Sequence, residues 1–250
     1  MNLRLRLAYD GTGFRGWARQ PGRRTVEGVL ERALTVVYPG WSDLAVAGRT
    51  DTGVHALGQV VSVSVGSGPP VEVAARVLTS ALPDDVAVDA AVEAPAGFHA
   101  RHSARSRTYR YRVRTAADRT ALDARRVLHH PGSLDLDVLS GWATTIVGTH
   151  DFRAFTPTET QHRDFGRTIT RADWTRVGDE LEFVVVGDRF LRHMVRTLVG
   201  TMLVAARGEP AACPIDLLAG APRALAGPTA PAWALYLIDV GYDDGDATVT

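Results

Sequence analysis

The amino-acid sequence predicts two halves that each mix strands with helices, the first of them an α/β pattern with one sheet. Three observations lead to this prediction. Leu3, Leu5 and Leu7 alternate with polar or small residues, which indicates a half-buried strand. Apolar residues recur at helical spacing in residues 26–37, which indicates an amphipathic helix. The same mixture of patterns returns later in the chain, so we expect one half over residues 1–105 and a second over 106–250.

In the first half, strands and helices alternate around one loop. Thr25 can cap a helix, because its side-chain oxygen can accept from the first N–H groups of that helix. Residues 11–16 match the glycine spacing of a dinucleotide-binding loop. Pro21 and Gly22 follow where such a loop requires a helix, so we discount a nucleotide site. The expected elements are strands ending near Tyr9 and over 44–47, 60–65 and 86–92, and helices over 26–37 and 73–81.

The second half shows the same mixture, without a legible repeat period. Gly178 lies where a hairpin is expected to turn. Asp188 can cap an apolar helix that begins near Arg189. The expected elements are strands over 108–114, 168–177, 181–186 and 235–240, and helices over 136–147 and about 190–206.

Composition excludes several classes of protein. The chain has 250 residues, of which 45% are hydrophobic and 22% charged, as in an ordinary globular protein. Its single cysteine, Cys213, excludes a disulfide framework, so we expect a reducing, cytoplasmic setting. We find neither the apolar core of a signal peptide nor an uncharged run of membrane-spanning length. The histidines lack metal-ligand spacing, so we expect no metal.

The positive charge is unevenly distributed, although the formal net charge is zero. All 28 cationic side chains are arginines, which removes lysine chemistry and favours bidentate contacts to phosphate. A bias against lysine codons explains this equally well. Nine arginines and only two acidic residues lie between Arg101 and Arg126, interleaved with Tyr109 and Tyr111. Such a run is either a solvated face or a surface that follows an RNA backbone and stacks bases.

The loop at residues 48–56 is the main candidate for chemistry. It places Asp51 between glycines and between two predicted strands, with Arg49 before it and His55 after it. A plain turn is the alternative interpretation. An aspartic-protease site needs a second carboxylate that shares a proton, and Arg49 would keep Asp51 ionised, so that reading is weak.

Two arginines, Arg192 and Arg196, lie four residues apart in the apolar helix predicted near residue 190. An arginine in such a helix requires a carboxylate partner, because an unpaired buried charge is costly. Asp51 and Asp188 are both candidate partners.

Taken in order, these motifs resemble the TruA family of tRNA pseudouridine synthases. The resemblance covers nearly the whole chain, and several ordered motifs make it specific. The sequence departs from the family's pattern at Ala18, Trp233 and Ala234, which affects local loop and pocket contacts and not the catalytic assignment. The matching segments are 9–17, 48–56, 98–111, 148–152, 190–200 and 229–237.

The resemblance implies a fold and a reaction. The implied fold is of the α+β class: a continuous mixed, mainly antiparallel sheet flanked by helices, with the active cleft between two similar halves. The implied enzyme is a homodimer that acts on tRNA. It converts uridine to pseudouridine in the anticodon stem-loop, at positions 38, 39 and 40, by breaking the N1–C1′ bond and rejoining the base through C5. This isomerisation needs no cofactor.

The resemblance also implies roles for particular residues. Asp51 is the nucleophile, and Arg196 pairs with it and orients it. Tyr109 stacks on the target uracil, although as a strand residue it could equally belong to the core. Arg49 holds phosphate or fills the gap left by the flipped base, and Leu235 packs against the ring. The RNA backbone is expected on Arg101, Arg105, Arg107 and Arg110. The alternative functions are a non-catalytic RNA-binding protein on the same scaffold and an N-glycosylase that releases the base.

Overall fold

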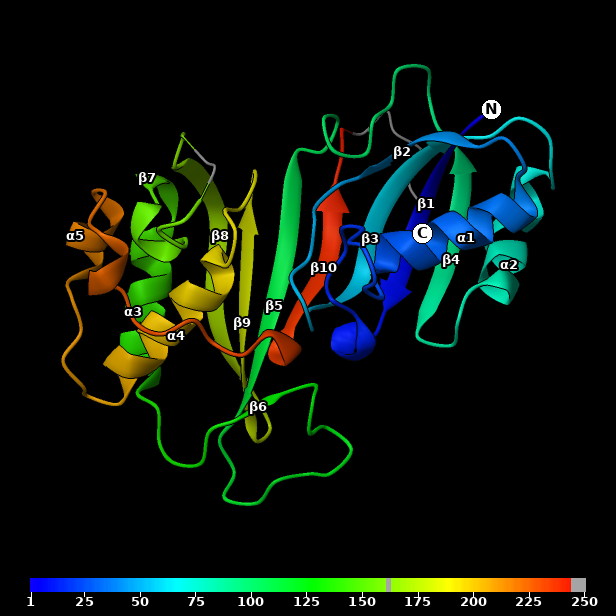
Figure 1. The fold of residues 1–250 in the computed structure, drawn as a ribbon. Coiled ribbons are helices and arrows are strands. Elements are labelled where there is room, and N and C mark those ends of the chain that lie inside the picture. Colours follow the sequence, from blue (N-terminus) through cyan, green and yellow to red (C-terminus); the bar gives the residue numbers. More distant parts are fainter. Residues whose placement is uncertain (161–162, 244–250) are drawn as a thin grey trace. The chain divides into compact units, whose positions relative to one another are not determined.

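The computed structural model of the chain describes residues 1–160 and 163–243. His162 and the part of the acidic C-terminal segment beyond Asp243 lie outside these residues. The chain forms two compact units (Figure 1). The first contains Met1–Arg107 and the segment from Tyr236 onward, and the second contains Thr108–Leu235. The domain boundary expected near residue 105 stays a prediction.

The first unit is built on a mixed sheet. Strand β1 pairs antiparallel with both β3 and β4, and β2 pairs antiparallel with β3. The C-terminal strand β10 runs parallel to β3, with Tyr236 opposite His55. This pairing is the reason that the end of the chain belongs to the N-terminal unit. The strands are β1 Asn2–Tyr9, β2 Ser42–Val46, β3 His55–Ser64, β4 Val86–Glu93 and β10 Leu235–Gly241, in the order β4-β1-β3-β10.

Two helices, α1 (Val26–Val37) and α2 (Val71–Ala81), cover one face of this sheet (Figure 1). The bounds of α1 agree with the prediction, because the signals for it are local. Thr25 Oγ1 accepts from the Gly28 N–H at 3.3 Å, which satisfies one N–H that the first turn of a helix otherwise leaves without a partner. Leu30 and Leu34 are fully buried, and each contributes about 1.5–3 kcal/mol by leaving water.

The second unit holds the other strands and helices. Strands β5, β9, β8 and β7 follow one another in that order, and β6 pairs parallel with β5. The β8–β9 pair is the predicted hairpin. The strands are β5 Ser106–Arg114, β6 Leu128–His129, β7 Gly148–Asp151, β8 Gly166–Val177 and β9 Glu180–Gly187, and the helices are α3 Leu136–Ile146, α4 Met194–Ala206 and α5 Pro214–Leu218. The predicted α+β class, with mainly antiparallel strands flanked by helices, is confirmed.

The start of α4 corrects one prediction. Asp188 does not cap a helix, since its Oδ1 accepts from the Thr168 N–H at 3.0 Å and from the Arg189 N–H at 2.8 Å. The helix begins only at Met194, after His193 in a left-handed conformation with φ of 61°. Arg192 therefore precedes the helix and does not share a helical face with Arg196.

The structure contains several short elements that the sequence analysis did not predict. They are strands β6 and β7, helix α5 and the 3-10 turns Gly11–Gly13, Arg153–Phe155, Arg223–Leu225 and Ala232–Ala234. Each is too short for apolar periodicity to reveal it. Within residues 1–160 and 163–243, the helices are too short or too polar to cross a membrane.

Candidate active site

The loop between β2 and β3 carries Asp51, and a buried polar network holds its entry side. Gln59 on β3 is fully buried. Its Nε2 donates to the Gly48 carbonyl at 2.7 Å and to the Tyr9 hydroxyl at 3.3 Å. The Tyr9 hydroxyl and Thr50 Oγ1 lie 2.8 Å apart. Either hydroxyl can be the donor of this last bond. The network therefore connects two strands to two residues of the loop.

Tyr9 stays neutral in this network. Burial raises the pKa of Tyr9 to about 12, and the hydrogen bonds with Thr50 and Gln59 oppose that rise only in part. A phenol that remains protonated keeps the same hydrogen-bond partners. The anchor of the loop is consequently insensitive to pH in the neutral range.

His55, the first residue of β3, holds the exit side of the loop. Its buried ring stacks on Tyr236 of β10 at 4.7 Å between centroids and 19° between planes. The Gly11 N–H donates to His55 Nδ1 at 3.1 Å, and Asp10 Oδ1 lies 3.2 Å from the same nitrogen. One nitrogen cannot accept from Gly11 and donate to Asp10 at once. Since the Gly11 amide is a fixed donor, the Nδ1 atom carries the lone pair, and Asp10 Oδ1 accepts instead from the Thr12 N–H at 2.9 Å.

The segment between β1 and α1 lies against the loop that carries Asp51. The Trp17 N–H donates to the Thr50 carbonyl at 3.0 Å. Gly16 has φ of +89°, and a Cβ on it would lie 2.9 Å from the Thr50 carbonyl oxygen and 3.2 Å from the Thr52 nitrogen. Glycine is therefore required here by backbone approach. The glycine-rich pattern of residues 11–16 thus supports the loop that carries Asp51.

Asp51 is half-buried, and its neighbour Thr52 is exposed. The Val54 N–H donates to the Asp51 carbonyl at 3.1 Å, so residues 51–54 do form a turn. The turn is compatible with a chemical role for Asp51, because it fixes the backbone from which the carboxylate projects. Arg49 is on the same loop and is exposed. A carboxylate that reaches the surface from a braced backbone is suited to attack a bound substrate, since catalysis requires precise placement.

The remaining predicted substrate residues lie in the second unit. Tyr109 on β5 is 7% exposed, and its ring meets Phe190 edge to face at 5.1 Å. Arg196 is half-buried in the first turn of α4, and its Nε donates to the Ala230 carbonyl at 2.8 Å. Leu235, at the start of β10, is buried. Arg196 and the segment that leads to Leu235 are therefore brought together.

The arginines between Arg101 and Arg126 differ in burial and in hydrogen bonding. Arg107 is 8% exposed, and its guanidinium donates to the carbonyls of Ala47, Ala104 and Arg101 at 2.8–3.2 Å. These bonds tie the 98–104 loop to the end of β2. A guanidinium buried among backbone acceptors is a structural anchor, so the interpretation of Arg107 as an RNA-backbone contact is revised. Arg101 is exposed.

Acidic side chains balance much of the remaining charge. Arg110 lies 3.7 Å from Glu182 on the neighbouring strand β9, and Arg105 lies 2.7 Å from Asp243. Arg112 and Arg114 pair in the same way with Glu180 and Asp179. These pairs differ in burial: Arg105 and Asp243 are exposed, whereas Arg112 and Glu180 are half-buried. An exposed pair contributes only about 0–1 kcal/mol, so phosphate can displace Asp243 from Arg105 at little cost.

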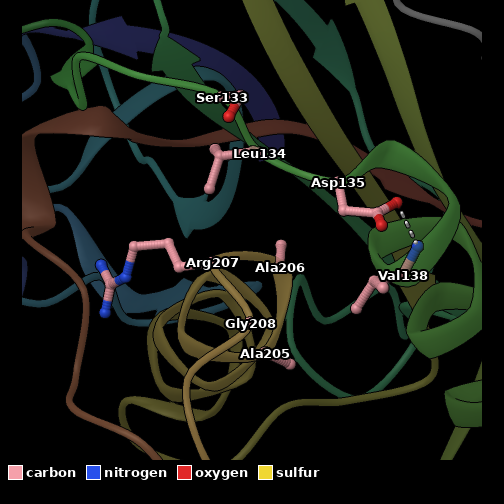
Figure 2. Close-up of a pocket in the computed structure, with 8 residues that line it drawn as sticks. All are labelled: Ser133, Leu134, Asp135, Val138, Ala205, Ala206, Arg207 and Gly208. Carbon is pink, nitrogen blue, oxygen red and sulfur yellow. Dashed lines mark hydrogen bonds between the residues drawn. The ribbon is translucent and has the colours of Figure 1, made fainter.

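A surface hollow elsewhere in the second unit is not the candidate site. It measures about 380 Å³ and lies where α3 begins and α4 ends (Figure 2). Asp135 Oδ1, at its edge, accepts from the Val138 N–H at 3.1 Å and so caps α3. None of the predicted site residues lines it. Among the residues that the structure places, no group of three or more His, Cys, Asp or Glu side chains could hold a metal ion.

Comparison with known proteins identifies a family. A family model described as tRNA pseudouridine synthase matches residues 7–103 and 143–243, more than half of the chain. The chain is 43% identical over 240 residues to tRNA pseudouridine synthase A of Geobacillus kaustophilus, covering 95% of this chain and 93% of that protein. It is 39% identical over 247 residues to the protein of the same name from Bacillus subtilis, covering 98% and 100%. A solved Cbf5-Nop10-Gar1 complex aligns with a TM-score of only 0.34 at 11% identity, covering 80% of this chain and 53% of that chain.

Proposed function

The chain belongs to the TruA family of tRNA pseudouridine synthases, and we propose that Asp51 is the nucleophile with which it converts uridine to pseudouridine in the anticodon stem-loop of tRNA. The observation that carries the assignment is the bracing of the Asp51 loop. Buried contacts hold it from Tyr9 and Gln59 on one side and from His55 on the other. A loop without a chemical task does not require three such supports.

The reaction conserves atoms and electrons. The N1–C1′ bond breaks, the uracil turns and a C5–C1′ bond forms; C5 gives up its proton to solvent, and N1 takes up a proton from solvent. An ionised carboxylate can serve this sequence in two ways: by attacking C1′ or by adding to C6 of the base. A carboxylate can act as a nucleophile without a general base to activate it, so positioning is the main requirement. The braced backbone supplies that positioning.

The other residues act on the substrate around the nucleophile. We assign Arg49 to a phosphate or to the gap left by the flipped uridine, which its exposure allows. We assign Tyr109 and Leu235 to the uracil ring and Arg196 to the orientation of the Asp51 carboxylate. Arg101, Arg105 and Arg110 are assigned to the RNA backbone, since their side chains are exposed or their ion pairs are weak.

Membership of the family also supports a proposal for the oligomeric state, the compartment and the target uridines. We propose that the enzyme acts as a homodimer in the cytoplasm and that its target uridines are those at positions 38, 39 and 40.

Tritium release from tRNA that carries C5-tritiated uridine tests the nucleophile. We expect the wild type to release tritium without free uracil, and Asp51→Asn to release none while it still binds tRNA. Asp84→Asn is the matched control, because it removes the same charge from an exposed position outside the loop. It should remain active.

Each other result has a definite meaning. Retained activity in Asp51→Asn, or loss of tRNA binding by it, contradicts the nucleophile role. Free uracil from the wild type indicates an N-glycosylase. A wild type that binds tRNA without releasing tritium favours the RNA-binding protein.

A further inference from the structure

Trp233 is a large aromatic side chain that the proposed mechanism does not use. It is 41% exposed, whereas the indoles of Trp17, Trp142 and Trp174 are buried. A single exposed apolar residue needs no explanation in itself. Trp233 differs because it lies two residues before Leu235 and because the backbone that carries it is tightly held.

Hydrogen bonds fix the backbone just before Trp233. The Ala230 carbonyl accepts from Arg196 Nε at 2.8 Å, and the Ala230 N–H donates to the Arg196 carbonyl at 3.0 Å. The carbonyl of Pro231 accepts from the Tyr111 hydroxyl at 2.9 Å. Two successive residues are therefore tied to α4 and β5.

Close packing fixes the same segment further upstream. A Cβ on Gly200 of α4 would lie 1.8 Å from the Pro228 carbonyl oxygen, so only glycine allows this approach. Thr229 Oγ1 and Thr197 Oγ1 lie 3.1 Å apart. The segment consequently lies on α4 without space to shift.

The 3-10 turn then directs the indole outward. Its other two residues, Ala232 and Ala234, are buried on either side of Trp233. Because these neighbours occupy the inward positions, the tryptophan remains at the surface. The backbone that carries the indole is already fixed before any ligand binds, so less entropy is lost when the indole stacks.

We propose that Trp233 stacks on an anticodon-loop base that neighbours the target uridine. Bases in RNA loops can be splayed out and stacked on aromatic side chains, and flipping a uridine exposes the face of its neighbour. Indole offers a large, rigid face for this contact. Stacking tolerates any base, so the contact adds affinity for the loop without selecting its sequence. This inference rests on the proposed function.

RNA binding by the full-length Asp51→Asn protein tests the contact without turnover. The probe is an anticodon stem-loop RNA. Adding Trp233→Ala should raise Kd about 5- to 150-fold, the range that loss of one stacked base implies. Trp233→Phe should recover most of the affinity. Leu225→Ala is the matched control, because Leu225 is 55% exposed in another 3-10 turn of the same unit. It should bind like the parent.

An abasic scan separates a stacking role from a structural one. When the base that stacks on Trp233 is removed from the RNA, Trp233→Ala should cause no further loss of affinity. When any other loop base is removed, Trp233→Ala should weaken binding as much as it does on the intact RNA. The intrinsic fluorescence of the parent should also be quenched by RNA more than that of Trp233→Phe. Unchanged Kd in Trp233→Ala, or an equal loss on every abasic RNA, overturns the proposal. A change in oligomeric state that accounts for the loss overturns it as well and assigns Trp233 to a protein interface.

The wild type's tritium release on the same RNA keeps the two proposals apart. If the wild type is active and Trp233→Ala binds normally, only the stacking role fails. If the wild type is inactive, the proposed function fails.

Discussion

Replacing Tyr9 with phenylalanine removes one hydroxyl from the network that holds the entry side of the Asp51 loop. The ring stays, so apolar packing is retained. The hydroxyl is 2.8 Å from Thr50 Oγ1 and accepts from Gln59 Nε2 at 3.3 Å. Its loss leaves a Gln59 N–H without this partner at a position with no solvent exposure. We expect both the stability and the turnover of the enzyme to fall.

The size of the effect follows from these contacts. A buried polar group that loses its partner costs about 1–3 kcal/mol. For a chain of this length, each kcal/mol lowers Tm by about 2–4 °C, so we expect a decrease of roughly 2–12 °C. A 1 Å displacement of a catalytic group costs about 10²-fold in rate. Because His55 still holds the exit side of the loop, we expect a smaller decrease in kcat, on the order of 10-fold.

Thermal unfolding and single-turnover tritium release together test the reasoning. Tyr38→Phe is the control, because Tyr38 is also buried and its hydroxyl donates to the Pro69 carbonyl at 3.1 Å, outside the Asp51 loop. It should lose stability and keep its kcat. The reasoning is refuted if Tyr9→Phe unfolds and turns over like the wild type, or if both variants lose the same kcat.

Four further predictions concern residues of the first unit. Arg107→Met should lower the free energy of unfolding by roughly 3 kcal/mol in urea, since several carbonyls lose a charged donor, whereas Arg101→Met should change it by less than about 0.5 kcal/mol. The same Arg101→Met should weaken tRNA binding and reduce the slope of log Kd against log salt by about 1, and an unchanged slope would place Arg101 away from phosphate. His55→Phe keeps an aromatic ring but removes the acceptor for Gly11, so kcat should fall in steady-state assays while KM for tRNA changes little; equal changes in both would indicate a general folding defect. Finally, burial raises the pKa of Tyr9 from 10.0 to about 12, so folding favours the neutral phenol. This contribution is complete below pH 10 and is lost as the pH rises from about 10 to about 12, so the stability gap between wild type and Tyr9→Phe should narrow by roughly 3 kcal/mol over that range. A constant gap in urea unfolding would contradict the assigned burial.

Elements with local signals could be predicted from the sequence. Helix α1 has a capping threonine directly before an apolar stripe, and both act within a few residues, so its bounds agree with the prediction. The loop that carries Asp51 is likewise contiguous, and its glycines and flanking strands are legible without the fold. By contrast, the requirement for glycine at position 16 could not be predicted, because it comes from the close approach of Thr50, which is distant in the sequence.

Features that depend on distant partners could not be predicted. Asp188 is a good helix cap by its residue type, but the sheet brings the Thr168 N–H to its carboxylate, and the helix begins later. Arg101 and Arg107 look equivalent in an arginine-rich run. Only the fold buries one of them among carbonyls and leaves the other at the surface.

The sequence by itself determined the family, the order of most strands and helices, and the loop from which Asp51 is proposed to act. Those properties depend on contiguous motifs and on periods of two and 3.6 residues, which a chain displays without folding. Only the tertiary structure decided what holds that loop and which arginines serve the fold. Tyr9, Gln59 and His55 acquire their roles through hydrogen bonds and stacking between segments distant in sequence, and such contacts exist only after the strands have paired.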